Sequence, residues 1–216
     1  MKTKLLLPLI LLTLITSLTS CASKEKPPRV RDETFIADIP PFEVGTFHLY
    51  AAFGLTKPKI YDFTAYFYPR SNMLYFTGRI GLDALNVGFS FTERTNLVAA
   101  KDKYIEAYET SSLRNEKPTK KNAFSKGSVA FNWGTLSPGY LAYANYYSNV
   151  EFILENKPYF RLLFESTKGE KPDDNISSPR INVYISPAQW EQIIETCNQD
   201  RMVQMTDEIL AQAEAF

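Results

Sequence analysis

The stretch "INVYISPAQWEQII", residues 181–194, contains the transition that decides the fold. Its first five residues alternate as in a β-strand, and Pro187 then marks the first turn of a helix that carries Trp190. A similar passage, "LNVGFSFTERTNLV", occupies residues 85–98. Each passage predicts a strand that leads directly into a helix. Their recurrence in one short chain indicates an internal duplication.

The segments before each passage repeat the same order of elements. Four strand-like segments rich in Tyr, Phe, Val and Ile precede each predicted helix, and Thr92 is placed to cap the first helix. We therefore predict an α+β fold of two ββββα repeats, with antiparallel curved sheets and one helix per repeat. The expected organisation is a signal peptide at 1–20, a lipidated cysteine and flexible tether at 21–41, a first repeat at 42–110, a linker loop at 111–127, and a second repeat with a C-terminal helix extension at 128–216.

The N-terminal segment has the features of a secretory signal. It reads "MKTKLLLPLILLTLITSLTSC", with two lysines, an apolar run and then small and hydroxyl residues. The apolar run is shorter than a membrane-spanning helix requires. The protein is therefore expected to be exported.

The end of this leader, "LTSC" at residues 18–21, resembles the lipobox of bacterial lipoproteins. The resemblance implies cleavage between Ser20 and Cys21 and acylation of Cys21, which would anchor the protein to a membrane. Ala22 in place of Asp implies the outer membrane or cell surface, with the periplasmic side as an alternative. The competing interpretation is an ordinary signal peptide followed by an incidental cysteine.

Composition argues against several kinds of chemistry. Lys plus Arg and Asp plus Glu number 24 each, so there is no long-range basic field of the kind that attracts nucleic acid. With His48 as the only histidine, neither a zinc site nor a Ser-His-Asp triad is readily built. Cys197 shares a helical face with Trp190 and Ile193, so we interpret it as a buried hydrophobic residue and not as a catalytic thiol. We predict no catalytic residue, no metal and no cofactor.

Alternation along the strands separates an inner face rich in Phe from an outer face rich in Tyr. The inner face includes Phe76, Val87, Phe164 and Val183, and the two helices are expected to cover it. Tyr suits a half-exposed strand, which accounts for much of this pattern. The alternative is a ligand-binding face on which rings stack planar groups and arginines supply charge. The candidate residues of this face are Tyr50, Tyr66, Tyr68, Tyr75, Arg79, Tyr143, Asn145, Tyr147, Tyr159, Arg161 and Tyr184.

The second block also resembles a known family. "ENKPYFRLLFE", residues 155–165, followed by residues 181–197, is similar to the PUR repeat of Pur-alpha-like proteins. The resemblance implies four antiparallel strands and a helix per repeat, and single-stranded nucleic acid as a partner. The match departs where Pro158 and Tyr159 replace the Arg-Gly-Arg of that family.

These observations predict a lipid-anchored envelope lipoprotein that acts as a non-enzymatic binding or structural module. A PUR-like nucleic-acid-binding protein is the first alternative, and an envelope hydrolase with acidic residues is the second. The tail carries Met202, Met205, Ile209, Ala213 and Phe216 loosely on one helical face. This face would lengthen a core helix or pack against a second copy in a homodimer.

Overall fold

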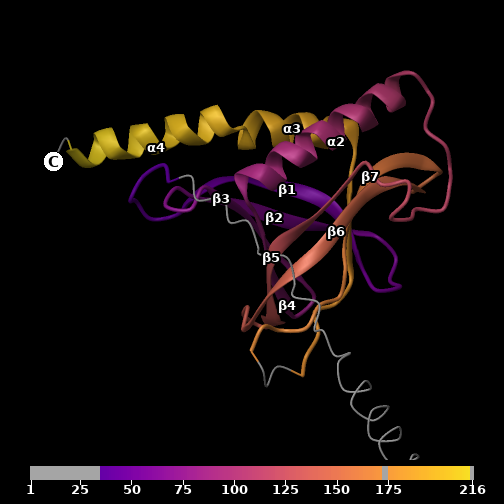
Figure 1. The fold of residues 1–216 in the computed structure, drawn as a ribbon, viewed down its shortest axis with the longest axis horizontal. Coiled ribbons are helices and arrows are strands. Elements are labelled where there is room, and N and C mark those ends of the chain that lie inside the picture. The colour runs from indigo at the N-terminus through magenta and orange to yellow at the C-terminus, as the bar shows by residue number, and fades with distance from the viewer. Residues whose placement is uncertain (1–34, 172–174, 215–216) are drawn as a thin grey trace, which may run out of the picture. The chain divides into compact units, whose positions relative to one another are not determined.

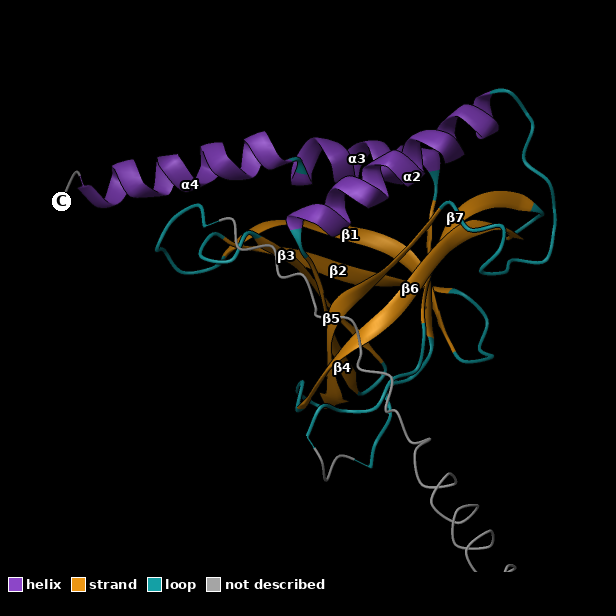
Figure 2. Cartoon of the chain, in the orientation of Figure 1, coloured by secondary structure: helices purple, strands orange, loops and turns teal. Residues whose placement is uncertain are grey.

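Eight antiparallel strands form one closed barrel in the computed structural model, which describes residues 35–171 and 175–214 (Figures 1 and 2). The signal-peptide and Cys21 predictions lie outside these residues. Each strand pairs with the next, and the last pairs with the first. The strands are β1 (Phe42–Phe53), β2 (Lys59–Tyr68), β3 (Met73–Ile80), β4 (Asp83–Phe89), β5 (Ser125–Thr135), β6 (Tyr140–Ile153), β7 (Lys157–Phe164) and β8 (Ile181–Ile185).

The prediction of two PUR-like ββββα repeats, each with its own curved sheet, is wrong. Pairing of β4 with β5, from Asp83 opposite Thr135 to Gly88 opposite Ala130, joins the two halves of the chain. Pairing of β1 with β8 closes the ring at the other seam. The alternation of residues fixes which face of a strand is buried, but it does not determine the neighbouring strand. The same strand-forming sequence is therefore compatible with two sheets or with one barrel.

Helices lie at one end of the barrel, where two cover the opening and the last projects beyond it (Figure 1). They are α2 (Phe91–Glu109), between β4 and β5, and then α3 (Pro187–Cys197) and α4 (Gln199–Glu214), which follow β8. We call this end the helix end. The opposite end carries the β1–β2, β3–β4, β5–β6 and β7–β8 connections, and we call it the loop end. Among the described residues, no helix has the length and apolar character needed to cross a membrane.

Serine begins both of the helices that leave a strand. The Ser90 side chain accepts a hydrogen bond from the Glu93 backbone N–H, so Ser90, and not Thr92, caps α2. Ser186 and Gln189 form a reciprocal capping box at the start of α3, with Pro187 in the first turn as predicted. Such caps satisfy backbone donors that have no partner within the helix.

The tail forms a separate helix and does not extend α3. Asn198 has extended backbone angles (φ −70°, ψ 154°), which interrupt the helix after Cys197. Its side chain then accepts a hydrogen bond from the Arg201 backbone N–H at 2.8 Å and starts α4. Met202 and Thr206 of α4 are buried, whereas no described residue after Thr206 is.

Inward-facing side chains fill the barrel. Each large buried aromatic side chain stabilises the fold by about 1.5–3 kcal/mol through the apolar surface it removes from water. The most deeply buried phenylalanines come from four strands around the ring, and they are Phe47, Phe63, Phe67, Phe131, Phe160 and Phe164. Side chains therefore occupy most of an eight-stranded interior, as its small diameter requires.

The connection from α2 to β5, residues 110–124, lies against the outside of β6 and β7. The buried Asn149 amide donates to the Thr119 carbonyl and to Asn122 Oδ1, each at 2.9 Å. Lys120 pairs with Glu165 at 2.6 Å. The connection thus covers part of the outer wall that the sequence analysis proposed as a ligand face.

Replacing Asn149 should release this connection. Asn149→Ala removes both donors and leaves the acceptors without them, which should lower the free energy of unfolding by about 1–3 kcal/mol. Cleavage by trypsin after Lys120 and Lys121 should accelerate accordingly. Asn145→Ala, at an exposed position of the same strand, is the matched control. Equal cleavage rates in the two variants would contradict the assigned role of Asn149.

Candidate functional site

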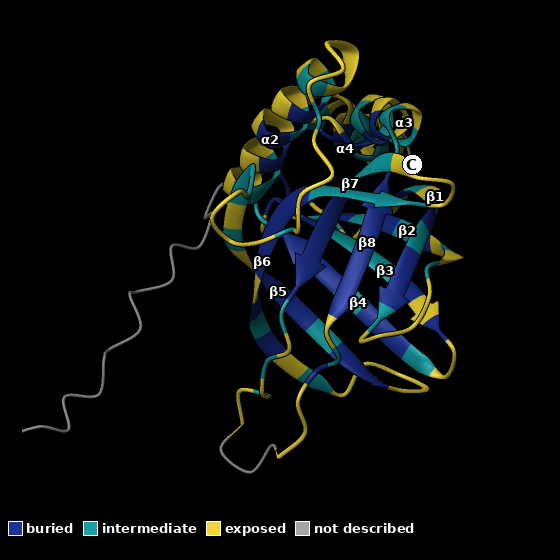
Figure 3. Ribbon diagram, turned by 90° about the vertical axis from the view of Figure 1, so that its right-hand side faces the viewer, coloured by how far each residue is buried: buried dark blue, intermediate teal, exposed yellow. Residues whose placement is uncertain are grey.

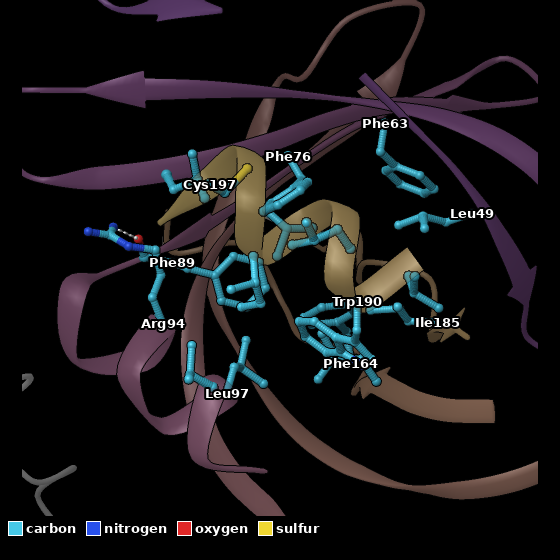
Figure 4. Close-up of a pocket in the computed structure, with 17 residues that line it drawn as sticks. Leu49, Phe63, Phe76, Phe89, Arg94, Leu97, Phe164, Ile185, Trp190 and Cys197 are labelled. Atoms are coloured by element: carbon cyan, nitrogen blue, oxygen red, sulfur yellow. Dashed lines mark hydrogen bonds between the residues drawn. The ribbon is translucent and has the colours of Figure 1, made fainter. Parts of the chain in front are cut away.

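An apolar cavity of about 100 Å³ lies inside the barrel at the helix end (Figure 4). The wall comes from six of the eight strands, and α2 and α3 cover it. β5 and β6 contribute no lining residue. The lining residues are Leu49, Phe63, Leu74, Phe76, Val87, Phe89, Arg94, Leu97, Val98, Leu162, Phe164, Val183, Ile185, Trp190, Ile193, Ile194 and Cys197.

The surface of this cavity is almost entirely hydrocarbon. None of the lining residues carries a carboxylate, and Arg94 is the one charged residue among them. Figure 4 shows the Arg94 stem beside the cavity and its guanidinium directed away from it. A cavity lined in this way stays free of water, because a water molecule needs two or more polar partners. The arrangement suits an apolar group and offers no acid–base pair.

Two adjacent residues fasten the start of α2 to the rest of the molecule. Arg94 donates to the Asn72 carbonyl (2.8 Å), to Asn72 Oδ1 (2.8 Å) and to Gln199 Oε1 (2.6 Å). Glu93 accepts a short hydrogen bond from the buried Tyr146 hydroxyl. Burial, followed by this bond, raises the pKa of Tyr146. The first turn of α2 is therefore fixed to the β2–β3 turn, to β6 and to the start of α4.

An aromatic cluster fastens the far half of α2 and the start of α3. The Tyr104 hydroxyl donates to the Pro158 carbonyl at 3.0 Å, and its ring lies 5.6 Å from the Phe160 ring. Phe160 in turn stands perpendicular to Trp190 of α3, with ring centroids 5.1 Å apart. Such edge-to-face pairs add about 0.5–1.5 kcal/mol beyond the burial of area. Both helices are thus held at β7.

The cavity reaches the surface between the fastened ends of α2 and α3. Val98 of α2 lines the cavity yet is exposed, and Ile194 of α3 is half-buried. The two helices make few direct contacts with each other. An apolar chain entering from solvent would meet the mouth between these two side chains.

Two polar groups belong to the otherwise apolar lining. The buried Trp190 indole N–H has no hydrogen-bond acceptor in the described part of the chain. The Cys197 thiol is buried as predicted, and this burial raises its pKa to about 12. The thiol is accordingly protonated and unreactive at neutral pH. The Trp190 N–H is thus a buried donor without an acceptor among the described residues.

The predicted Tyr-rich face lies on the outer, convex wall of the barrel and is distributed around it. Tyr68 and Tyr75 pack together with ring centroids 4.7 Å apart, and Tyr50 and Tyr159 form a second pair at 6.0 Å. Arg79 and Asn145 are exposed, and Tyr66 and Tyr143 are half-buried. Figure 3 shows that the strands of this wall are mostly buried or half-buried, with exposed positions mainly in the loops.

The remaining three candidates are buried by their surroundings. Arg161 pairs with Glu151 at 2.9 Å, and its guanidinium lies 5.6 Å from the centre of the Tyr147 ring. Burial raises the pKa of Tyr184 to about 12. Because Tyr147, Arg161 and Tyr184 are covered, their rings and charge are not presented for stacking. The structure does not bring the candidate residues into one open face.

Sequence reasoning identified the inner-face residues as core but missed the cavity among them. Phe76, Val87, Phe164 and Val183 were expected to point inward, and they line the cavity. The residue types at these four positions are the same whether the core is filled or contains a cavity. The only sequence signal was the pair of strand-to-helix junctions, which predicted that both helices cover the inner face.

Comparison with known proteins gives a family. The chain belongs to the family described as "uncharacterised Treponema protein", which matches residues 22–204. An uncharacterized protein of Treponema pallidum (strain Nichols) is 26% identical over 180 residues, which is 83% of this chain. The match covers 65% of that relative, so the chain spans less than two thirds of its length. No solved structure gives a significant match.

Cys197 reports on whether the helices stay closed over the cavity. With a pKa near 12 in place of 9.0, its thiolate fraction at pH 8 should be roughly a thousandfold below that of a free thiol. Its reaction with a thiol reagent should be slow in the native protein. Gln199→Ala, which removes an acceptor of Arg94 at the α3–α4 junction, should accelerate the reaction. The exposed Gln192→Ala is the control, and fast labelling of the unmodified protein would contradict the assignment.

Proposed function

We propose that this protein is a lipid-anchored, non-enzymatic binding module of the bacterial envelope, whose barrel holds a slender apolar chain beneath α2 and α3. The observation that carries the proposal is the hydrocarbon-lined cavity at the helix end, which reaches the surface between Val98 and Ile194. Apolar pockets with few polar groups are typical of ligand sites, and the mouth of a barrel is a common place for them.

The size of the cavity limits how a ligand could enter. A cavity of about 150 Å³ suffices for a molecule such as benzene, and the volume here is about 100 Å³. A longer chain would have to enlarge the site by moving α3 away from α2. The Arg94–Gln199 hydrogen bond, which joins α2 to the start of α4, resists that movement. Binding energy from the apolar chain would have to exceed the cost of breaking this contact.

An acyl chain is the ligand class that best matches this lining. Each methylene removed from water contributes about 0.8 kcal/mol, or roughly a fourfold gain in affinity. The polar head of such a chain would remain at the mouth. The lining contains no carboxylate that would repel a fatty acid anion.

The cavity is tested by filling it. In Ile194→Trp, a larger side chain at the half-buried mouth should reduce the affinity for a fluorescent apolar probe such as 1-N-phenylnaphthylamine at least tenfold. Gln192→Trp, on the exposed face of the same helix, should bind as the unmodified protein does. Competition by saturated fatty acids of increasing length should show the roughly fourfold gain per methylene until the site is filled. Equal probe affinity in the two tryptophan variants would overturn the proposed site.

The anchor is tested separately at Cys21. Cys21→Ser removes the sulfur that would carry the acyl groups, so the protein should move from the membrane fraction to the soluble fraction on cell lysis. Metabolic labelling with palmitate should be lost in parallel, because two or more acyl chains are needed for stable anchoring. Unchanged fractionation and labelling of the variant would refute the anchor. This result would leave the cavity proposal intact.

A further inference from the structure

Each of the four connections at the loop end presents an exposed aliphatic side chain. Leu55 of the β1–β2 turn is fully exposed. Leu82 of the β3–β4 turn is 68% exposed, Leu136 of the β5–β6 turn 62%, and Ile176 of the β7–β8 connection 51%. Single exposed leucines are ordinary on protein surfaces, whereas here every connection at one end of the barrel carries an exposed aliphatic residue. We call these four residues the aliphatic tips.

Backbone hydrogen bonds hold the four connections together at this end. The Leu136 N–H donates to the Leu82 carbonyl at 2.9 Å, which joins two of the turns. The Gly54 N–H donates to the Arg180 carbonyl at 2.9 Å, which joins the β1–β2 turn to the end of the β7–β8 connection. The Glu170 N–H donates to the Leu141 carbonyl at 2.8 Å and ties that connection to β6. The four connections that carry the aliphatic tips therefore surround the same end of the barrel, in the lower part of Figure 3.

Local stability does not explain why a leucine occupies position 136 in the β5–β6 turn. Leu136 adopts a φ of +69°, in the left-handed region where Gly and Asn are favoured and a bulky side chain is strained. A turn selected for stability would have Asn or Gly there. Leu136 contributes nothing to the core in return, because its side chain points into solvent. Leu136 therefore favours neither the turn nor the core, and its exposed side chain is free to contact a partner.

Basic side chains surround the aliphatic tips. Lys57, Lys59, Arg79, Lys168, Lys171 and Arg180 belong to the same turns and strand ends. The acidic residues in these segments are Asp83, Glu165 and Glu170, and the sequence adds Asp173 and Asp174. Glu165 is paired with Lys120, which lies outside these segments. The loop end thus combines apolar tips with a small excess of positive charge in a chain that is neutral overall. This combination matches a bilayer surface, where aliphatic groups enter the boundary of the acyl region and lysines meet anionic headgroups.

We propose that the loop end docks onto a lipid bilayer that contains anionic lipids, with the aliphatic tips inserted between the headgroups. This docking does not depend on the proposed ligand cavity, which lies at the other end of the barrel. It is compatible with an anchor at Cys21, since the 13 residues from Ala22 to Thr34 can extend about 45 Å. The barrel could therefore rest on its loop end while the anchor occupies the same membrane.

Vesicle binding by the chain that begins at Ala22 tests the proposal. This chain lacks the leader and Cys21 and keeps all of the described core, which comes from Ala37 to Thr206. It should bind vesicles of phosphatidylcholine and phosphatidylglycerol (3:1) more tightly than vesicles of phosphatidylcholine alone. Replacing all four aliphatic tips with Asn should lower the partition coefficient at least tenfold. Leu136→Asn alone should weaken binding while keeping or raising the melting temperature.

The matched control replaces four exposed apolar residues of the helix end with Asn. They are Phe35, Phe91, Tyr108 and Leu154, of which Leu154 also has a positive φ (+46°). This variant should bind vesicles as the unmodified chain does. Binding of 1-N-phenylnaphthylamine should be unchanged by the tip substitutions, so failure of this proposal is distinguishable from failure of the ligand site. Three outcomes would each overturn it: no vesicle binding by the unmodified chain, equal binding by the tip variant, or an equal loss in the control.

Discussion

Closure of the barrel between β1 and β8 is the constraint on which the rest of the structure depends. The two strands pair over four positions, from Tyr50 opposite Tyr184 to Phe53 opposite Ile181. A strand at an open edge would present unpaired backbone groups, and closure removes both edges at once. It also places the first and last strands side by side, so that α3, which follows β8, contacts β1. Without this seam there would be no enclosed interior for the helices to cover.

Closure also explains why the interior is nearly full and where it is not. An eight-stranded barrel has room for its own side chains and little more. Large aromatic side chains fill the half nearest the loop end, including Phe131 and Trp133, whose rings lie 5.9 Å apart. At the helix end, α2 packs on β5 and α3 packs on β1. The space beneath and between these two helices is not filled by side chains, and it is the cavity. The opening of the barrel is round, whereas the two helices that cover it are straight and are held at their ends. The helices therefore do not fill the space beneath them, and a cavity remains.

The sequence predicted the local structure better than the assembly. Alternation identified the inward-facing Phe76, Val87 and Val183, because burial on one face imposes a period of two on any strand. The two similar passages do mark equivalent positions: β4 and β8 both run toward the helix end, and Ser90 and Ser186 each cap the helix that follows. Strand partners were not predictable, since pairing depends on contacts between residues distant in sequence. The PUR-like fold expectation failed for this reason. The candidate site also depends on the assembly, which the sequence did not predict. The curvature of the barrel distributes the Tyr-rich outer face around a convex wall. The connection at residues 110–124 covers part of this wall at Asn149.

The two ends of the barrel differ in a way that stability alone does not require. At the helix end, α2 and α3 cover the opening of the barrel, and polar contacts of Arg94 and Glu93 fix the covering helix. At the loop end, aliphatic residues occupy turns where polar residues or glycine would be less costly in water. Leu136 makes the contrast sharpest, because its backbone conformation favours Asn and its side chain gains nothing from the core. A residue that is unfavourable for both the turn and the solvent is best explained by an apolar environment that the isolated chain lacks. A bilayer surface supplies such an environment.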